Sequence, residues 1–382
     1  AQNTMTSSPY SMFGLGEMAS GLYGQNTSMA GVTVGMREGI LMNIENPAGL
    51  TALDSCKLFA EASAFVKNER YRSDGSSSNA FTGNFSAFSL GGRIMRRWYM
   101  SAGVTPYSFV GYYFKSSQEL EGSPGTFVTS TFSGTGGLSK AFLSQGFSLT
   151  KHLSVGMNLN FIFGNMTLNE IQSAMTVSRE MSGRSFYADF GLQYHRPIAR
   201  ETFLTVGAIY GYKQRISLKN TVTVTGSSTE TPYNQKRVTQ YLPQYIGIGS
   251  SLAHKKWTYV LDYLFRQYGV LNSGDSRVKF RDSHELRLGV CYFPNGFSSS
   301  SYWKRMSYKA GVSVSTPYLR LKGQSGGAYR VSVGLGLPVL NGRINTAFYY
   351  DRLQLQGNAL RRDIMGFTVT YTLSEKFYQV KL

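Results

Sequence analysis

The chain has 382 residues and a formal net charge of +18, yet only 16% of its residues are charged, against about 25% in a typical soluble domain. Aromatic residues make up 14% of the chain and glycine occupies 42 positions, a composition that argues against a cytosolic helical or α/β enzyme. The basic residues lie in short clusters between apolar segments and form no single arm or helix face, so we expect no nucleic-acid partner. No apolar run reaches about 18 residues, which excludes a helical membrane protein.

The first 54 residues show no alternation of apolar and polar positions and are rich in Gly, Met, Ser and Asn. Three short motifs stand out in this segment: Ser11–Gly16 (SMFGLG), Met29–Val32 (MAGV) and Asn46–Leu50 (NPAGL). Asn46 before Pro47 favours a turn, because proline fixes its own backbone and asparagine can bond local amides. On the residues alone, Asn46, Pro47 and Ala48 either set the entry into the first strand or serve a functional contact.

The remainder of the chain alternates with period two, the pattern of strands that have one apolar and one polar face. Between Leu153 and Phe163, for example, every second residue is large and apolar. Division at the turn residues predicts fourteen strands, near 57–67, 79–91, 97–118, 127–144, 151–174, 184–195, 202–218, 238–253, 256–269, 280–293, 304–317, 328–337, 343–353 and 361–373. We expect no amphipathic helix after Leu53.

The strand number, strand length and connections favour an all-β fold, a 14-stranded antiparallel transmembrane β-barrel, over a soluble β-sandwich. Bacterial single-chain barrels have an even number of strands, short periplasmic turns and longer outer loops. Most even-numbered connections are short, although Pro294–Trp303 is long, and odd-numbered ones such as Lys219–Arg237 and Tyr318–Gly327 are long and polar. The alternation predicts a Gram-negative outer-membrane protein whose N- and C-termini are periplasmic.

Basic residues gather at the predicted rims of the barrel. Arg93, Arg96, Arg97, Lys255 and Lys256 are candidate contacts to phosphates of membrane lipids and lipopolysaccharide, because Lys and Arg at the edge of an apolar band can reach headgroups. Arg343 is expected at the same rim. Asp262 and Arg266 share one parity of a strand and could instead pair with each other inside the barrel.

No catalytic, metal or nucleotide motif is evident, so we expect neither an enzyme nor a cofactor. Ser283 and His284 have suitable atoms for hydrolysis, but neighbours on a strand point to opposite faces. Cys56 and Cys291 match no metal or redox motif. We expect two free, buried thiols, while a disulfide stays open.

The order of a Gly-rich segment, a Met-Ala-Gly step and Asn46-Pro47-Ala48 before fourteen strands resembles the FadL-like family of long-chain fatty acid transporters, in its Bacteroidota-type branch. The resemblance implies that residues 1–54 form a hatch inside the lumen, with Asn46, Pro47 and Ala48 as its motif, and that residues 55–382 form the barrel with a short periplasmic C-terminal tail. It also implies a lateral gate beside a kinked third strand. Gly103 and Pro106 lie in that strand, and Pro106 predicts a local break or bulge, since proline cannot complete a sheet ladder.

Two functions follow from the resemblance. The first is passive uptake of hydrophobic or amphipathic small molecules through the hatch and the lateral opening. The alternative is a structural or docking subunit of a larger outer-membrane complex, such as a protein secretion or assembly machine, with outer-membrane or periplasmic proteins as partners. The Tyr318–Gly327 loop and the tail from Glu375 to Leu382 would then be contact surfaces.

Overall fold

The computed structural model describes residues 6–19, 24–73, 76–119, 125, 127–173, 175–226, 230–273, 278–294, 301–321, 323–356 and 360–376. Long antiparallel strands dominate it. The strands of the wall are β2 (Lys57–Ser73), β3 (Ser76–Met95), β4 (Trp98–Glu119), β5 (Phe127–Ser148), β6 (Leu153–Gln172), β7 (Met175–Ala199), β8 (Thr202–Gly211), β9 (Gln214–Thr225), β10 (Glu230–Leu242), β11 (Tyr245–His254), β12 (Trp257–Arg266), β14 (Ser283–Tyr292), β15 (Ser307–Ser315), β17 (Gly326–Val339), β18 (Gly342–Leu355) and β19 (Arg361–Lys376).

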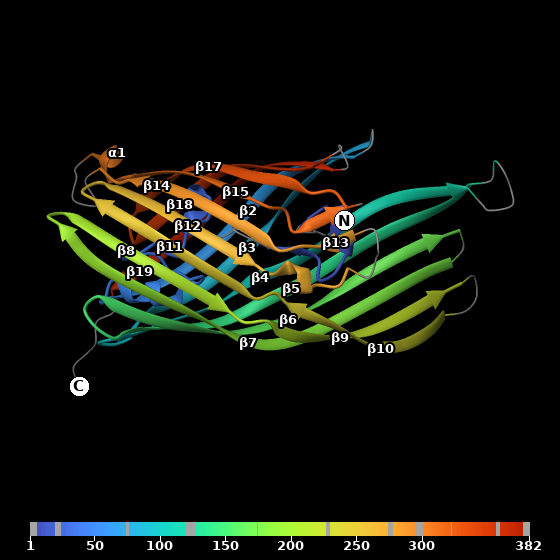
Figure 1. The fold of residues 1–382 in the computed structure, drawn as a ribbon, viewed down its shortest axis with the longest axis horizontal. Coiled ribbons are helices and arrows are strands. Elements are labelled where there is room, and N and C mark those ends of the chain that lie inside the picture. Colours follow the sequence, from blue (N-terminus) through green and yellow to red (C-terminus); the bar gives the residue numbers. More distant parts are fainter. Residues whose placement is uncertain are drawn as a thin grey trace.

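These strands close into a barrel with fourteen wall positions in the described part of the chain. β8 and β9 share one position, because β7 pairs with both, and β10 and β11 share the next. The last strand, β19, pairs with the first, β2, from Arg361↔Arg72 to Lys376↔Lys57. The predicted all-β, 14-stranded antiparallel barrel is therefore confirmed (Figure 1).

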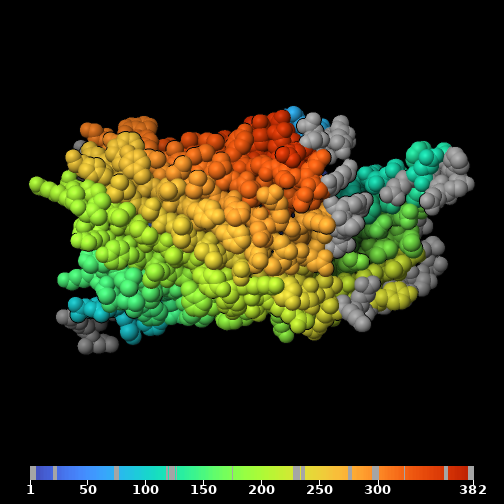
Figure 2. All heavy atoms as spheres, in the orientation of Figure 1, coloured from blue at the N-terminus to red at the C-terminus, as the bar shows by residue number. Residues whose placement is uncertain are grey.

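The alternation of the sequence is expressed as an apolar outside and a polar inside. On β12, Tyr259, Leu261 and Tyr263 are exposed, whereas Asp262 between them is fully buried. This is the inverse of a soluble protein and suits a wall whose outer face contacts lipid. Figure 2 shows one side of this close-packed wall, with the green hairpins extending beyond the orange part at one end.

The short elements lie before, between and beyond the wall strands. They are η1 (Pro9–Met12), β1 (Glu17–Met18), η2 (Gln25–Met29), η3 (Pro47–Ala52), η4 (Tyr268–Val270), β13 (Val278–Phe280), α1 (Tyr302–Arg305) and β16 (Leu319–Leu321), with β13 paired to β16. No helix in the described ranges is long and apolar enough to cross a membrane.

Two expectations about strand bounds were wrong. The connection Lys219–Arg237 is mostly a hairpin of β9 and β10, because its β-branched Thr and Val residues still find ladder partners beyond the apolar band. The strand expected at 184–195 likewise extends over Met175–Ala199. Between β14 and β15 the single helical turn α1 has no buried residue and is too short to form an amphipathic helix.

The N-terminal segment, defined here as described residues 6–19 and 24–54, lies against the inner wall. η2 contacts β14, β15, β17 and β18, while η3 contacts β4, β5, β6 and β7. Its apolar side chains are buried, with Met29, Val32 and Leu50 at 0% exposure. The segment therefore contacts opposite sides of the wall (Figure 1), and its role as a hatch stays a prediction.

Candidate functional site

Three carboxylates of the N-terminal segment form ion pairs with arginines of the wall. Glu17 pairs with Arg362 on β19, Glu38 with Arg343 on β18 at 2.8 Å, and Glu45 with Arg287 on β14 at 3.4 Å. The Arg287 and Arg343 side chains are 1–2% exposed. Arg287 is also paired with Glu285 of its own strand at 2.9 Å, so two carboxylates compensate its charge. Breaking a buried ion pair is costly, so these contacts hold the segment in place.

Arg343 therefore does not belong to the lipid-facing rim where the sequence placed it. Its strand position turns the side chain inward, and burial of its charge is compensated by Glu38. The expected pair between Asp262 and Arg266 is also wrong. Arg266 instead contacts Glu285 at 2.9 Å, because Glu285 is supplied by the neighbouring strand β14.

Asp262 is the point at which the wall binds the backbone of the N-terminal segment. Its carboxylate accepts hydrogen bonds from the amides of Thr33, Val34 and Gly35 at 2.6, 2.8 and 3.2 Å. Three converging N–H groups compensate the burial of a carboxylate. This role of Asp262 was not predicted from the sequence. Its only indication there is an acidic residue within a strand whose other residues are mostly apolar.

The Asn46-Pro47-Ala48 turn is fully buried against the wall. The Asn46 side-chain amide donates to the carbonyl of Val34 at 2.7 Å, and its oxygen accepts from the Ala48 amide at 3.3 Å, which caps η3. The side chain thus fixes the turn and the neighbouring loop together.

Glycines of the wall make room for this turn. A Cβ atom at Gly156 would lie 2.4 Å from the Pro47 carbonyl carbon, and one at Gly191 would lie 2.2 Å from the Asn46 side-chain oxygen. Both glycines occupy inward positions of adjacent strands, β6 and β7, and pair with each other. Glycine allows such close backbone approach. This docking surface could not be predicted from the sequence, where Gly156 and Gly191 are two among 42 glycines.

The charge environment keeps the segment's carboxylates ionised. Burial would raise the pKa of Glu38, but the positive charges of Lys309 and Arg343 hold this pKa below its ordinary value. Burial likewise opposes ionisation of Glu45, and Arg287 and Arg266 hold its pKa below the usual range. Both pairs are therefore charged at neutral pH.

A lateral groove lies where the third wall strand, β4, separates from β3. The ladder between the two strands runs from Met95↔Trp98 to Phe88↔Val104 and no further among the described residues. Gly103 lies in the adjacent pair, opposite Ser89. The ladder of β4 with β5 then shifts between Pro106 and Ser108, the irregularity that a proline imposes on a sheet.

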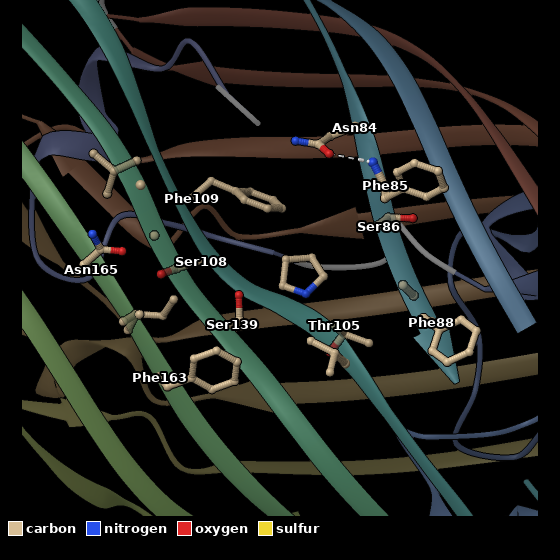
Figure 3. Close-up of a pocket in the computed structure, with 18 of the residues that line it drawn as sticks. Asn84, Phe85, Ser86, Phe88, Thr105, Ser108, Phe109, Ser139, Phe163 and Asn165 are labelled. Carbon is tan, nitrogen blue, oxygen red and sulfur yellow. Dashed lines mark hydrogen bonds between the residues drawn. The ribbon is translucent and has the colours of Figure 1, made fainter. Parts of the chain in front are cut away.

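The groove has a volume of about 840 Å³. Its rim carries the rings of Phe85, Phe88 and Phe163, all exposed. Figure 3 shows these rings around the opening, together with Thr105 and Ser108 of β4. Thr105 and Ser108 are 1% exposed and form a buried polar floor, and Asn84, Ser139 and the exposed Asn165 also line the groove.

The N-terminal segment covers part of the β4 edge that β3 leaves open. β1 pairs with it through Glu17↔Phe109 and Met18↔Ser108. Further along, the Gly111 amide donates to the Ser11 hydroxyl at 3.0 Å. Residues 11–19 thus follow the free edge of β4 as an added strand would.

The five basic residues that are candidate contacts to lipid phosphates lie at or beside two short turns of the wall. Arg93, Arg96, Arg97, Lys255 and Lys256 are all exposed, and the last four lie in the turns between β3 and β4 and between β11 and β12. Trp98 stacks on Phe147 beside the first turn. Their contact with lipid phosphates stays a prediction.

Ser283 and His284, whose side chains have suitable atoms for hydrolysis, form structural hydrogen bonds. The Ser283 hydroxyl donates to the Thr316 carbonyl, whereas His284 bonds Tyr263. Within the described ranges no three His, Cys, Asp or Glu side chains form a group that could hold a metal ion. Both cysteines are free thiols, and Cys56 is exposed rather than buried because it precedes the first strand.

Similar solved structures share this fold at low sequence identity. The toluene transporter TodX of Pseudomonas putida matches with 17% identity and a TM-score of 0.62, over 94% of this chain and 99% of that one. A FadL homologue of Pseudomonas aeruginosa matches with 12% identity and a TM-score of 0.62, over 95% and 100%. The Ralstonia pickettii toluene transporter TbuX gives 14% and 0.59, over 93% and 98%.

Two of these neighbours are toluene transporters, and at such low identity the likeness shows a shared fold. No curated protein matches the chain significantly. The model of one family, described as BamG, matches residues 1–381. A match over almost the whole chain shows that this protein belongs to the BamG family.

Proposed function

We propose that this protein acts as a docking subunit of a larger outer-membrane complex and that its lateral wall, rather than its lumen, is the working surface. The observation that carries the proposal is the filled lumen. Glu17, Glu38 and Glu45 tie the N-terminal segment to three separate wall strands, and Asp262 binds its backbone. A passage through the lumen would have to break several buried charged contacts.

The cavities beside the N-terminal segment support the same interpretation. They measure about 40, 100, 120 and 380 Å³, the last of them beside Ile40 and Arg343, against about 840 Å³ for the lateral groove in the wall. Each cavity beside the segment is therefore smaller than the groove that opens through the wall. Membership of the BamG family, whose name hints at an assembly role, adds support.

Native purification tests this proposal. The protein is extracted from outer membranes in a mild detergent, isolated through an affinity tag on an outer loop, and weighed by native mass spectrometry. A stoichiometric protein partner is the expected result. A barrel that is recovered alone from membranes, with and without prior chemical cross-linking, would overturn the proposal.

A second candidate function is lateral passage of a hydrophobic small molecule. The lateral groove favours it, with its rim of Phe85, Phe88 and Phe163, together with the fold shared with toluene transporters. Liposomes that contain the purified barrel should then take up toluene faster than empty liposomes. A bulky substitution in the groove, Ser108→Trp, should remove this difference, and equal uptake by both kinds of liposome would exclude the function.

A further inference from the structure

Beyond Phe88, where the ladder with β4 ends, the edge of β3 has backbone groups without a ladder partner among the described residues. Residues Ser76 to Phe85 and Ala87 pair with β2, with Ser86 bulged between them, but no described residue pairs with the other side of this segment. Successive backbone amides of a strand point alternately toward one neighbouring strand and toward the other. Because the Phe85 amide donates to the side chain of Asn84 at 2.8 Å rather than across a ladder, the amides of Phe81 and Gly83 also point away from β2.

An open edge is costly in a wall that contacts lipid. Water is absent from the bilayer core, and each unsatisfied backbone group there costs several kcal/mol. Phe81, at 73% exposure, and Phe85, at 76%, mark this part of β3 as outward-facing and apolar. The Phe85 amide has such a partner in Asn84, whereas the amides of Phe81 and Gly83 require one.

Buried hydroxyl groups along the same opening also lack a partner. Those of Thr82 and Ser86 on β3, and of Thr105 and Ser108 on β4, make no hydrogen bond within the described structure, although the four side chains are 1–6% exposed. A hydrocarbon would leave these hydroxyls and the β3 amides unsatisfied. An extended polypeptide offers both N–H and C=O groups at strand spacing.

We propose that the β3 edge binds an extended segment of a partner polypeptide by strand addition, with apolar side chains of that segment toward lipid. The neighbouring edge shows the same mode of binding, since β1 and Ser11 already cover β4 from Tyr107 to Gly111. This inference rests on the proposed docking function and specifies where and how the partner is held.

Site-specific photo-cross-linking in native outer membranes tests the inference. Benzoyl-phenylalanine replaces Phe81 or Phe85, and the cross-linked peptides are identified by mass spectrometry. Strand pairing requires that a move of four residues along β3 shifts the adduct by about four residues along one partner segment. Phe348 is the matched control, because it is also exposed but lies on β18 between two complete ladders.

A register-shifted pair of adducts, absent at Phe348, supports strand addition. Adducts to lipid alone, to this chain itself, or equally at the control position would overturn it. If native purification yields a partner while the β3 probes label only lipid, the strand-addition inference fails and the docking function stands. If no partner is found by either method, both fail.

A backbone variant separates main-chain binding from side-chain binding. Phe81→Pro removes the amide that faces the opening and keeps the ladder to β2, whereas Phe81→Ala keeps the amide and removes the ring. Loss of one buried hydrogen bond should lower cross-linking from the Phe85 probe roughly fivefold to tenfold in Phe81→Pro. We expect less than about a twofold change in Phe81→Ala; equal losses in both variants would contradict main-chain recognition.

Discussion

The attachment of the N-terminal segment to the wall is tested most directly at Asp262. Asp262→Asn keeps the shape of the side chain but replaces one carboxylate oxygen with an NH₂ group. That group cannot accept a hydrogen bond, so at least one of the amides of Thr33, Val34 and Gly35 loses its acceptor. The other bonds lose their charge assistance.

The magnitude follows from these contacts. One buried amide without an acceptor costs about 1–3 kcal/mol, and a neutral bond is roughly half as strong as a charge-assisted one. We expect local release of the segment to become easier by about 2–3 kcal/mol, which raises the population of the released state roughly 30- to 140-fold.

Hydrogen exchange of the barrel in lipid nanodiscs measures this population at residues 33–35. Asp351→Asn is the control, because Asp351 pairs with Arg330 across β17 and β18 at 2.6 Å and so acts within the wall. Exchange at 33–35 should accelerate in Asp262→Asn alone. Unchanged exchange in that variant, or equal acceleration in both, would refute the reasoning.

Three further predictions concern the Asn46-Pro47-Ala48 turn, the lateral groove and the pH dependence of the segment's attachment. Asn46→Ala should lower the urea midpoint of the segment's release by an amount equivalent to about 1–2 kcal/mol, because it removes a buried cap; an unchanged midpoint would contradict this role. Gly137→Ala should destabilise the barrel by about 1–3 kcal/mol in denaturant unfolding, since its φ is +146° and a Cβ would lie 2.3 Å from the Ser108 carbonyl oxygen; wild-type stability would show that β4 shifts freely. The lowered pKa of Glu38 means that its pairing with Arg343 contributes stability above the ordinary value of 4.5 and loses it as pH falls through the lower, folded-state pKa. Protease sensitivity of the segment should therefore rise in acid, and Glu38→Gln should weaken this pH dependence; a pH profile identical to wild type would assign the transition to other groups.

The barrel follows from the sequence alone. Strand periodicity is local, since each residue's face follows from its parity, and turn residues mark the ends, so the fourteen positions of the wall were predicted in order. The breaks between β8 and β9 and between β10 and β11, and the short strands β13 and β16, were not predicted. The irregular pairing of β4 and β5 at Pro106 could also be predicted from the sequence, because the lack of an amide hydrogen is a property of proline itself.

The contacts between inward residues depend on the tertiary structure. Parity turns Asp262, Arg287 and Arg343 toward the lumen, but their partners in the N-terminal segment lie more than 200 residues away along the chain. The end of the β3–β4 ladder at Phe88 cannot be read from the sequence either, because β3 keeps its ladder with β2 beyond it, with a bulge at Ser86. Pairing depends on where two strands diverge in space, and that divergence creates the lateral groove.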